Sequence, residues 1–341
     1  MARGAVVKRM IESRAATRVR RELMIGVVVA AALGCALPAG AQEFPSKPVR
    51  IIAPFPAGGG ADIAARRLAE RLLNRWKQPV VVQNIAGAAG NLAAAATAAS
   101  EPDGYTLFFA SLPILVTNPA LYAKPGFDAE RDFAPVVLVS DTPHILLVNA
   151  PFPAATLPEL IAYAKARPGK VNFGSGGQGT SLHLAGELLK ARAGIDIVHI
   201  PYKGTAPASA ALLGDEIQMV FDSGASALGQ IRGGRVRALA IASKVRAQVL
   251  PEVPTFDEGG IANFYSGVPH GVFVRAGTPA AIVTALNRVI NAVFEEPEYR
   301  RQAAASGINL AGGGPQQLTA YLAAERNQWL PIIRSQGIKA F

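Results

Sequence analysis

Short apolar runs rich in valine and isoleucine alternate with helical patterns along most of the chain, and this alternation constrains the fold more than any other feature. The first predicted strands are residues 49–53, 80–83, 106–110 and 135–139. Between them, apolar side chains such as Ile63, Leu68 and Leu72 recur at helical spacing. Strands that alternate with helices predict an α/β fold with largely parallel sheets.

A second series of strands follows the first and leads into a helical tail. These strands are predicted at residues 145–149, 171–174, 197–201, 217–222 and 238–242. A capping box at Thr156 and Glu159 predicts a helix start. The predicted tail helices are residues 279–295, 298–305 and 315–335. This order predicts two lobes, the first formed by residues 44–143 with 269–341 and the second by residues 144–268.

The first 41 residues have the pattern of an export signal. A basic region ends at Arg21, an apolar segment covers residues 23–37, and Ala39-Gly40-Ala41 fits a signal peptidase site, so we expect cleavage after Ala41. The apolar segment is shorter than the roughly 20 residues of a membrane-spanning helix. Arg20-Arg21 loosely fits a twin-arginine signal. Cys35, the only cysteine, leaves a lipoprotein anchor as an alternative.

The charge of the chain favours a small anionic ligand. Lys and Arg number 34 against 24 Asp and Glu, a net charge of +10, and part of this excess lies in the predicted signal peptide. No run of Lys or Arg interleaved with aromatic residues follows residue 41. The sequence therefore predicts no nucleic-acid partner.

Glycine loops stand at several junctions between a predicted strand and a predicted helix. Gly58, Gly59 and Gly60 follow the first strand, and no Lys-Ser or Lys-Thr pair of a nucleotide-binding loop comes after them. Similar loops lie at residues 84–91, 174–179 and 202–208. A helix N-terminus offers unpaired peptide N–H groups to an anion, so either a phosphate or a carboxylate would fit such loops.

One of these loops also matches a dinucleotide fingerprint. Gly174, Gly176 and Gly179 have the G-x-G-x-x-G spacing between a strand and a helix. The fingerprint expects an acidic residue at the end of the next strand, whereas Asp196 stands at that strand's beginning. An exported α/β enzyme with a cofactor at this loop is the alternative that the sequence leaves open.

Catalytic and metal-binding constellations are not apparent. The histidines His144, His183, His199 and His270 lie in contexts typical of packed imidazoles, and no two have an i, i+4 metal spacing. Ser175 lacks the G-x-S-x-G elbow of a nucleophile. Lys203 fits a charge that steers an anionic ligand better than a Schiff-base lysine. Asp62 fits a charge that complements the helix dipole better than a catalytic base. The sequence thus predicts no enzyme, cofactor or metal.

Motifs distributed over almost the whole chain after residue 41 carry a family resemblance. They are "PFPAGGGADIAAR" (54–66), "GAAGN" (87–91), "PDGYTL" (102–107), "NFGSGGQGTSLHLAGE" (172–187), "PYKGTAPA" (201–208) and "LPEVPTFDE" (250–258). In this order they resemble the Bug, or TctC, family of tripartite tricarboxylate transporter substrate-binding proteins. The resemblance implies a two-lobed periplasmic-binding-protein fold of the clamshell type.

The same resemblance implies where a ligand binds. The loop of residues 54–62 would hold one carboxylate through backbone N–H groups, and the second lobe would close over it. The implied ligand-binding residues are Phe55, Ala57, Gly58, Gly59, Asp62, Asn91 and Ser111 in the first lobe, and Ser175, Gly176, Thr180, Ser181, His183, Lys203, Gly204 and Asp222 in the second.

The implied function is that of a monomeric periplasmic receptor that binds a small organic acid and delivers it to a membrane permease. A receptor that feeds a signalling partner is a further alternative. One departure from the family pattern concerns the segment before Ala276, where Pro269, His270 and Arg275 replace an aromatic-rich sequence. Because of this departure, the identity of the ligand does not follow from the resemblance.

Overall fold

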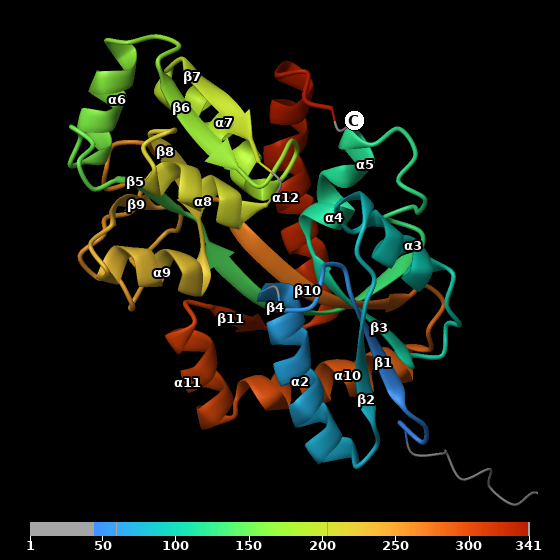
Figure 1. Ribbon diagram of the computed structural model, residues 1–341. Coiled ribbons are helices and arrows are strands. Elements are labelled where there is room, and N and C mark those ends of the chain that lie inside the picture. The colour runs from blue at the N-terminus through green and yellow to red at the C-terminus, as the bar shows by residue number, and fades with distance from the viewer. Residues whose placement is uncertain (1–43, 59, 203, 340–341) are drawn as a thin grey trace, which may run out of the picture. The chain divides into compact units, whose positions relative to one another are not determined.

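The computed structural model describes residues 44–58, 60–202 and 204–339 (Figure 1). The predicted signal peptide and its cleavage site, with Gly59 and Lys203, lie outside these residues. Lys47 and the residues that follow it form one compact unit, and the description below concerns that unit.

The first sheet has six strands in the order β11-β4-β10-β3-β1-β2. Their bounds are β1 Val49–Ala53, β2 Val80–Asn84, β3 Thr106–Ser111, β4 Phe133–Pro143, β10 Gly267–Arg275 and β11 Leu310–Gly312. β1 pairs in parallel with β2 and β3, whereas β10 pairs antiparallel with β3 and β4, and β11 antiparallel with β4. β10 and β11 were not predicted from the sequence.

The second sheet has five strands in the order β7-β6-β8-β5-β9. Their bounds are β5 Ile145–Asn149, β6 Val171–Ser175, β7 Ile197–Pro201, β8 Met219–Asp222 and β9 Val236–Ile241. β6 is parallel to β7 and β8, and β5 is antiparallel to β8 and β9. Both sheets are therefore mixed, where largely parallel sheets were expected. β5 enters the second sheet directly from β4 of the first, with only His144 between them, and runs antiparallel to both of its neighbours.

Helices cover both sheets. Their bounds are α2 Gly60–Trp76, α3 Asn91–Ala98, α4 Pro113–Val116, α5 Asn118–Leu121, α6 Leu157–Lys165, α7 Ser181–Ala193, α8 Thr205–Leu213, α9 Gly224–Arg232, α10 Ala280–Phe294, α11 Pro297–Ala305 and α12 Pro315–Ser335. Half of the predicted capping box is present at α6: Thr156 Oγ1 accepts from the N–H of Glu159 at 3.3 Å, while Glu159 Oε2 accepts from the N–H of Ala155, one residue before the N-cap. The tail helices agree with the predicted ranges to within about two residues.

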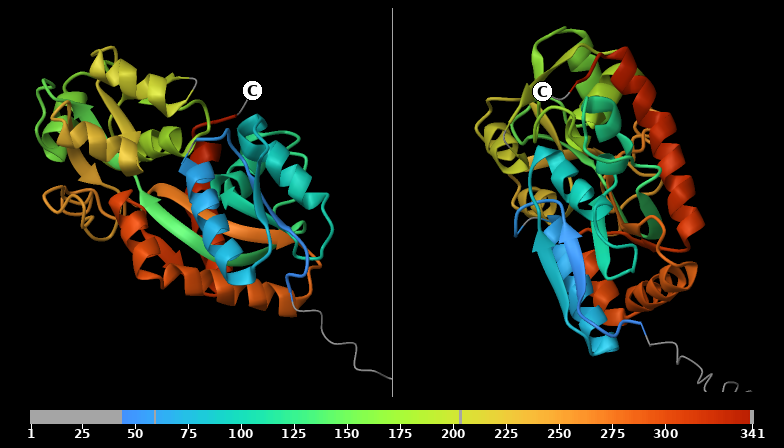
Figure 2. Two further views of the ribbon diagram at one scale, coloured as in Figure 1. Left: turned by 60° about the horizontal axis from the view of Figure 1, so that its bottom comes forward. Right: turned by 90° about the vertical axis from the view of Figure 1, so that its right-hand side faces the viewer.

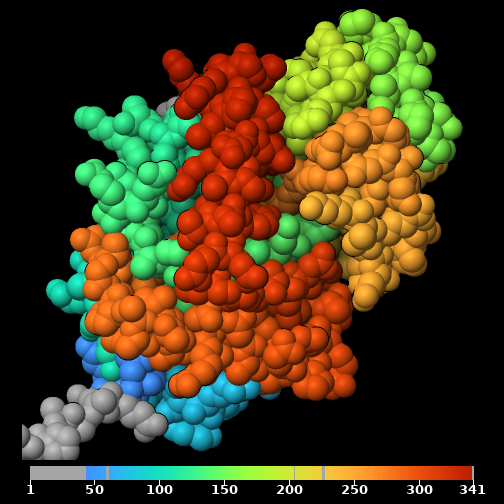
Figure 3. All heavy atoms as spheres, turned by 180° about the vertical axis from the view of Figure 1, so that it is seen from behind, coloured from blue at the N-terminus to red at the C-terminus, as the bar shows by residue number. Residues whose placement is uncertain are grey.

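One continuous buried cluster joins elements of both sheets. It contains Phe108 of the first sheet, Phe173 and Phe221 of the second, and Leu318 and Trp329 of α12. α12 packs against β4, α4 and α5 and also against α7, and Figure 3 shows it running along the back of the molecule between these elements. The helix therefore stabilises both sheets with one apolar face.

The chain passes from the first sheet to the second at His144 and returns before β10. The outgoing and returning strands pair antiparallel, with Thr142 opposite Val268, and the N–H of His144 donates to Ser266 O at 2.9 Å. In both views of Figure 2 the green-to-gold elements of the second sheet stay together, apart from blue β1 and β2. Among the described residues, no helix is long and apolar enough to cross a membrane.

Candidate ligand-binding site

The predicted ligand loops follow the carboxyl ends of parallel strands in both sheets. β1, β2 and β3 end at one edge of the first sheet, and β6, β7 and β8 end at one edge of the second. In open α/β sheets this edge is where ligands bind, because the following helices begin there with free N–H groups.

In the first of these loops, Asp62 is the centre of a hydrogen-bond network. Its carboxylate accepts from the N–H of Gly58 at 2.8 Å and from Asn84 Nδ2 at 2.9 Å. Arg66 Nε lies 3.0 Å from Oδ2 and 2.9 Å from Oδ1. Asn84 also donates to Phe55 O at 2.9 Å. The network therefore ties both ends of the loop to the first turn of α2.

This network changes the role that the sequence suggested for Asp62. The side chain is only 2% exposed, and the hydrogen bonds from Arg66 and Gly58 lower the pKa of Asp62 to about 2. Its oxygens face these donors, so Asp62 shapes the loop, while Ala57 and Gly58 are exposed. Asn84, which ends β2, begins the glycine loop predicted at residues 84–91 but was not among the predicted ligand-binding residues.

The loop after β2 has an unusual backbone. Ala88 and Ala89 both have positive φ angles, 46° and 52°, in a left-handed turn closed by the N–H of Gly90 on Gly87 O at 2.9 Å. Asn118 Nδ2 donates to Ala89 O at 3.1 Å and to Asn91 Oδ1 at 2.6 Å. The predicted site residue Asn91 is thus 3% exposed and paired with Asn118. Asn118 was not predicted from the sequence as part of the site.

Ser111 lies in the first sheet, as do His270 and Arg275, two of the residues that differ from the family pattern. Ser111 ends β3 opposite His270 of β10 and is 6% exposed. His270 packs on Phe109 with ring centroids 5.4 Å apart, and burial lowers the pKa of His270 to about 4. Arg275 faces Asp132 at 3.7 Å and donates to Ala98 O. His270 and Arg275 therefore belong to the packing of β10.

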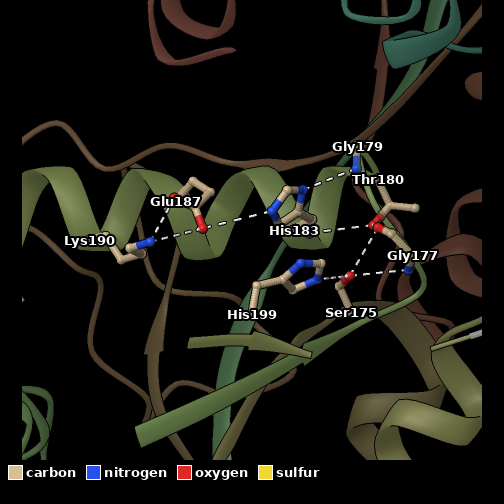
Figure 4. Close-up of polar contacts among 8 residues, drawn as sticks. All are labelled: Ser175, Gly177, Gly179, Thr180, His183, Glu187, Lys190 and His199. Carbon is tan, nitrogen blue, oxygen red and sulfur yellow. Dashed lines mark hydrogen bonds and ion pairs between the residues drawn. The ribbon is translucent and has the colours of Figure 1, made fainter. Parts of the chain in front are cut away.

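At the end of β6 and the start of α7, the side chains of Ser175, Thr180 and His183 lie together beside the loop (Figure 4). Ser175 Oγ lies 2.6 Å from His199 Nε2 and accepts from the N–H of Gly177 at 3.1 Å. His183 Nδ1 accepts from the N–H of Gly179 at 3.0 Å. Ser175 and His183 are 1% and 3% exposed, so their polar atoms hold the loop from beneath.

The remaining predicted residues of the second sheet lie on neighbouring loops. A Cβ at Gly176 would lie 3.4 Å from Gly204 C, so the loops after β6 and β7 touch. Asp222 accepts from the N–H of Ser223 at 2.7 Å and from Ser209 Oγ at 3.5 Å. Ser181 begins α7 and is half-buried.

The loop before α7 also contacts the first part of the chain. A Cβ at Gly179 would lie 2.8 Å from Leu121 Cδ1 of α5, and α7 packs against α12, as Figure 1 shows. The loop that carries Ser175 to Thr180 therefore lies against elements that follow β3, on the side where the first sheet has its own glycine loops.

Two hollows in the described part of the chain lie away from these loops. A cavity of about 70 Å³ is lined by Ile145, Gly224 and Gly307 among others, and a groove of about 450 Å³ by Lys47, Arg50 and Asp103 among others. None of the predicted ligand-binding residues lines either hollow. No group of metal-ligating side chains occurs among the described residues.

The family model for the tripartite tricarboxylate transporter family receptor, TctC, matches residues 64–338. The chain belongs to this family. It is 38% identical over 317 residues to protein BugT of Bordetella pertussis, a match that covers 93% of this chain and 97% of BugT. It is 36% identical over 322 residues to a UPF0065 protein of Pseudomonas sp. strain P51, covering 94% of this chain and 96% of that protein.

Solved structures agree with the family assignment. The R. palustris protein Rpa4515 with adipate has a TM-score of 0.79 and 31% identity, covering 88% of this chain and all of that one. MatC from Rhodopseudomonas palustris with bound malate has a TM-score of 0.74 and 30% identity, covering 85% and 100%. The periplasmic binding protein BugD has a TM-score of 0.74 and 32% identity, covering 87% and 99%.

These matches confirm the family and the fold class predicted from the sequence motifs. The chain has the α/β fold of two-lobed periplasmic binding proteins. Its family and its structural neighbours are solute-binding receptors and not enzymes. The fingerprint at Gly174 to Gly179 is therefore part of a TctC-type receptor, and the alternative of an exported enzyme is set aside.

Proposed function

We propose that this TctC-family receptor binds a small organic acid between two lobes, residues 44–143 with 269–341 and residues 144–268, and delivers it to a membrane permease of the tripartite tricarboxylate type. The signal pattern that ends at Ala41 supports a periplasmic location. The protein would act as a monomer. It would need no cofactor, because the backbone loops supply the groups that an acid needs.

The observation that carries this proposal is the design of the loops before α2 and α7. In each, buried side chains hold the backbone from within, Asp62 in the first and Ser175 with His183 in the second. Each loop also leads directly into a helix N-terminus. Peptide N–H groups at helix N-termini stabilise a carboxylate without a formal charge on the protein.

The proposed contacts divide into two kinds. Backbone groups of Ala57, Gly59 and Gly176 and the hydroxyls of Ser111 and Ser181 would touch the ligand, and Gly58, whose N–H donates to Asp62, would line the site. Lys203 would attract the anion to the site, and Gly204 would lie at its wall. Asp62, Asn91, Ser175, Thr180, His183 and Asp222 would support the loops, since their polar atoms already have partners within the protein. Phe55 would pack beside the ligand.

A thermal-shift titration tests the ligand class. Adipate and malate are the first probes, because Rpa4515 and MatC were solved with them; adipamide, which has the same chain length as adipate but no charge, is the matched control. A ligand at 100 times its Kd adds about 2.7 kcal/mol to the free energy of unfolding. No stabilisation by any organic acid, together with stabilisation by a dinucleotide, would refute the receptor proposal.

Small-angle scattering tests the two-lobed mechanism. A ligand that contacts both lobes favours the closed state by its differential affinity for that state. The radius of gyration should fall when a stabilising acid is added, and it should not change with adipamide. An unchanged radius at saturation, with an open ligand-free form shown by the same data, would exclude closure.

A further inference from the structure

The N-terminus of α7 is capped by an unusual residue. Thr180 is the N-cap, and its Oγ1 accepts from the N–H of His183 at 3.4 Å. In return, His183 Nδ1 accepts from the N–H of Gly179, one residue before the cap, at 3.0 Å. This resembles a capping box, in which Glu or Gln at the third helical position accepts from the N–H of the N-cap; here a histidine at that position accepts from the N–H one residue earlier.

The same chain contains the carboxylate version of this cap. At α6, Thr156 Oγ1 accepts from the N–H of Glu159 at 3.3 Å, and Glu159 Oε2 accepts from the N–H of Ala155 at 2.7 Å. The bonding pattern is identical to that of α7, with Glu159 in the place of His183. Glutamate thus satisfies this geometry on a helix away from the proposed site, which raises the question of what histidine adds at α7.

The imidazole of His183 is neutral. A peptide N–H can only donate, so Nδ1 must accept and the proton lies on Nε2. Nε2 faces Glu187 Oε1 at 3.7 Å, and Lys190 Nζ binds Glu187 Oε2 at 3.1 Å, which offsets the charge of this carboxylate. Burial lowers the pKa of His183 to about 3, with His199 and Lys190 as further causes.

A second imidazole fixes the position of the first. The rings of His183 and His199 stack with centroids 3.8 Å apart and an interplanar angle of 22°. His199 Nε2 lies 2.6 Å from Ser175 Oγ, which accepts from the N–H of Gly177. Figure 4 shows the two rings side by side beneath the loop. The N–H groups of Gly177 and Gly179 are thereby both held from inside.

The loop depends on these anchors. Gly179 has a φ of 76° and lies next to Leu121 of α5. Because glycine adopts both positive and negative φ angles, the backbone here is less restricted than it would be with another residue at this position. The N–H of His183 is used by Thr180, which leaves the first-turn N–H groups of Ser181 and Leu182 as helix donors for an anion. A carboxylate at position 183 would place a negative charge beside those donors. The charge of Asp62 at α2 is paired with Arg66, whereas Lys190 of α7 is already bound to Glu187.

We propose that His183 is a positioning residue: it caps α7 as a neutral acceptor, so that the loop of residues 176–180 is held in its binding shape without a negative charge that would repel a carboxylate ligand. The part of this inference that concerns the ligand rests on the proposed function. The part that concerns the loop does not.

Ligand-free NMR tests the loop. In the wild-type protein, the ¹⁵N spectrum of His183 at pH 7 should show an unprotonated Nδ1 and a protonated Nε2, and the amide of Gly179 should exchange slowly. His183→Gln supplies another neutral acceptor and should keep this protection. His183→Leu should increase the exchange rate of Gly179 at least tenfold. Protection of Gly179 that survives in His183→Leu would overturn the positioning role, as would a protonated Nδ1.

Ligand titration tests the charge. His183→Glu should keep Gly179 protected, as Glu159 holds Ala155 at α6, but it should weaken adipate or malate binding at pH 8 at least tenfold relative to His183→Gln. Glu159→Gln is the matched control for a Glu/Gln difference and should leave affinity unchanged. Equal affinities of the Glu and Gln variants would overturn the charge argument. If neither acid binds the wild-type protein, the proposed ligand class fails, while the exchange data still decide the positioning role.

Discussion

Replacing Asp62 by asparagine should destabilise the protein by an amount that depends on pH in a defined way. The substitution keeps the size of the side chain but removes the charge that Arg66 and the N–H of Gly58 stabilise. The pKa of Asp62 lies at about 2, against an ordinary value of 3.8. At about 1.4 kcal/mol per pKa unit, this shift corresponds to at most about 2–3 kcal/mol.

Solvent reduces this figure. The side chain of Arg66 is 52% exposed although that of Asp62 is 2% exposed, so water and salt screen the strongest partner. We therefore expect Asp62→Asn to lower the free energy of unfolding by about 1 kcal/mol at pH 7. Because the folded-state pKa is depressed, this contribution is complete above pH 3.8 and is lost as the pH falls through about 2.

Urea denaturation of both proteins at pH 7, 5 and 3 measures the effect. The difference between wild type and Asp62→Asn should be the same at pH 7 and pH 5 and smaller at pH 3. Asp215→Asn, an equal change of charge at an exposed position, is the control and should shift stability by less than about 0.5 kcal/mol. If Asp62→Asn matches this control at pH 7, or if its effect is undiminished at pH 3, the network around Asp62 does not stabilise the loop as argued.

Three further substitutions test the packing around the site. Burial raises the pKa of Glu325 to about 7, so the neutral carboxyl stabilises the fold and this contribution is lost as the pH rises through 7. In urea denaturation, Glu325→Gln should therefore be about 1–3 kcal/mol more stable than wild type at pH 8.5 and equal to it near pH 4. A difference that is the same at both pH values would contradict this. Gly186→Ala should destabilise by about 1–3 kcal/mol, because its Cβ would lie 2.0 Å from Phe173 Cε2, and an unchanged melting temperature would show that the ring moves freely. Asn118→Ala should cost about 1–3 kcal/mol, because Ala89 O loses its donor, and calorimetry that shows no loss would mean that water replaces it.

The sequence by itself determined the features that arise from neighbouring residues. The helix periodicity of residues 280–335, the helix cap at Thr156 and Glu159, and the alternation that gives an α/β fold depend on residues within a few positions of each other. The ordered motifs also identified the family, because six of them occur in one order along the chain.

The pairing of distant strands was decided by the tertiary structure. β10 is apolar for much of its length, but its place between β3 and β4 depends on contacts with segments more than 100 residues away. No local pattern encodes such a register, and so the sheets were expected to be more parallel than they are.

The roles of the site residues were likewise decided in three dimensions. The sequence placed Asp62, Ser175 and His183 at glycine loops, but it did not predict the direction in which their side chains point. That direction is set by partners far along the chain: Asn84 for Asp62, and His199 for Ser175 and for the ring of His183. A buried polar group must find a partner within the fold, and only the packing of β2 against α2 and of β7 beneath α7 brings those partners within hydrogen-bonding and stacking distance.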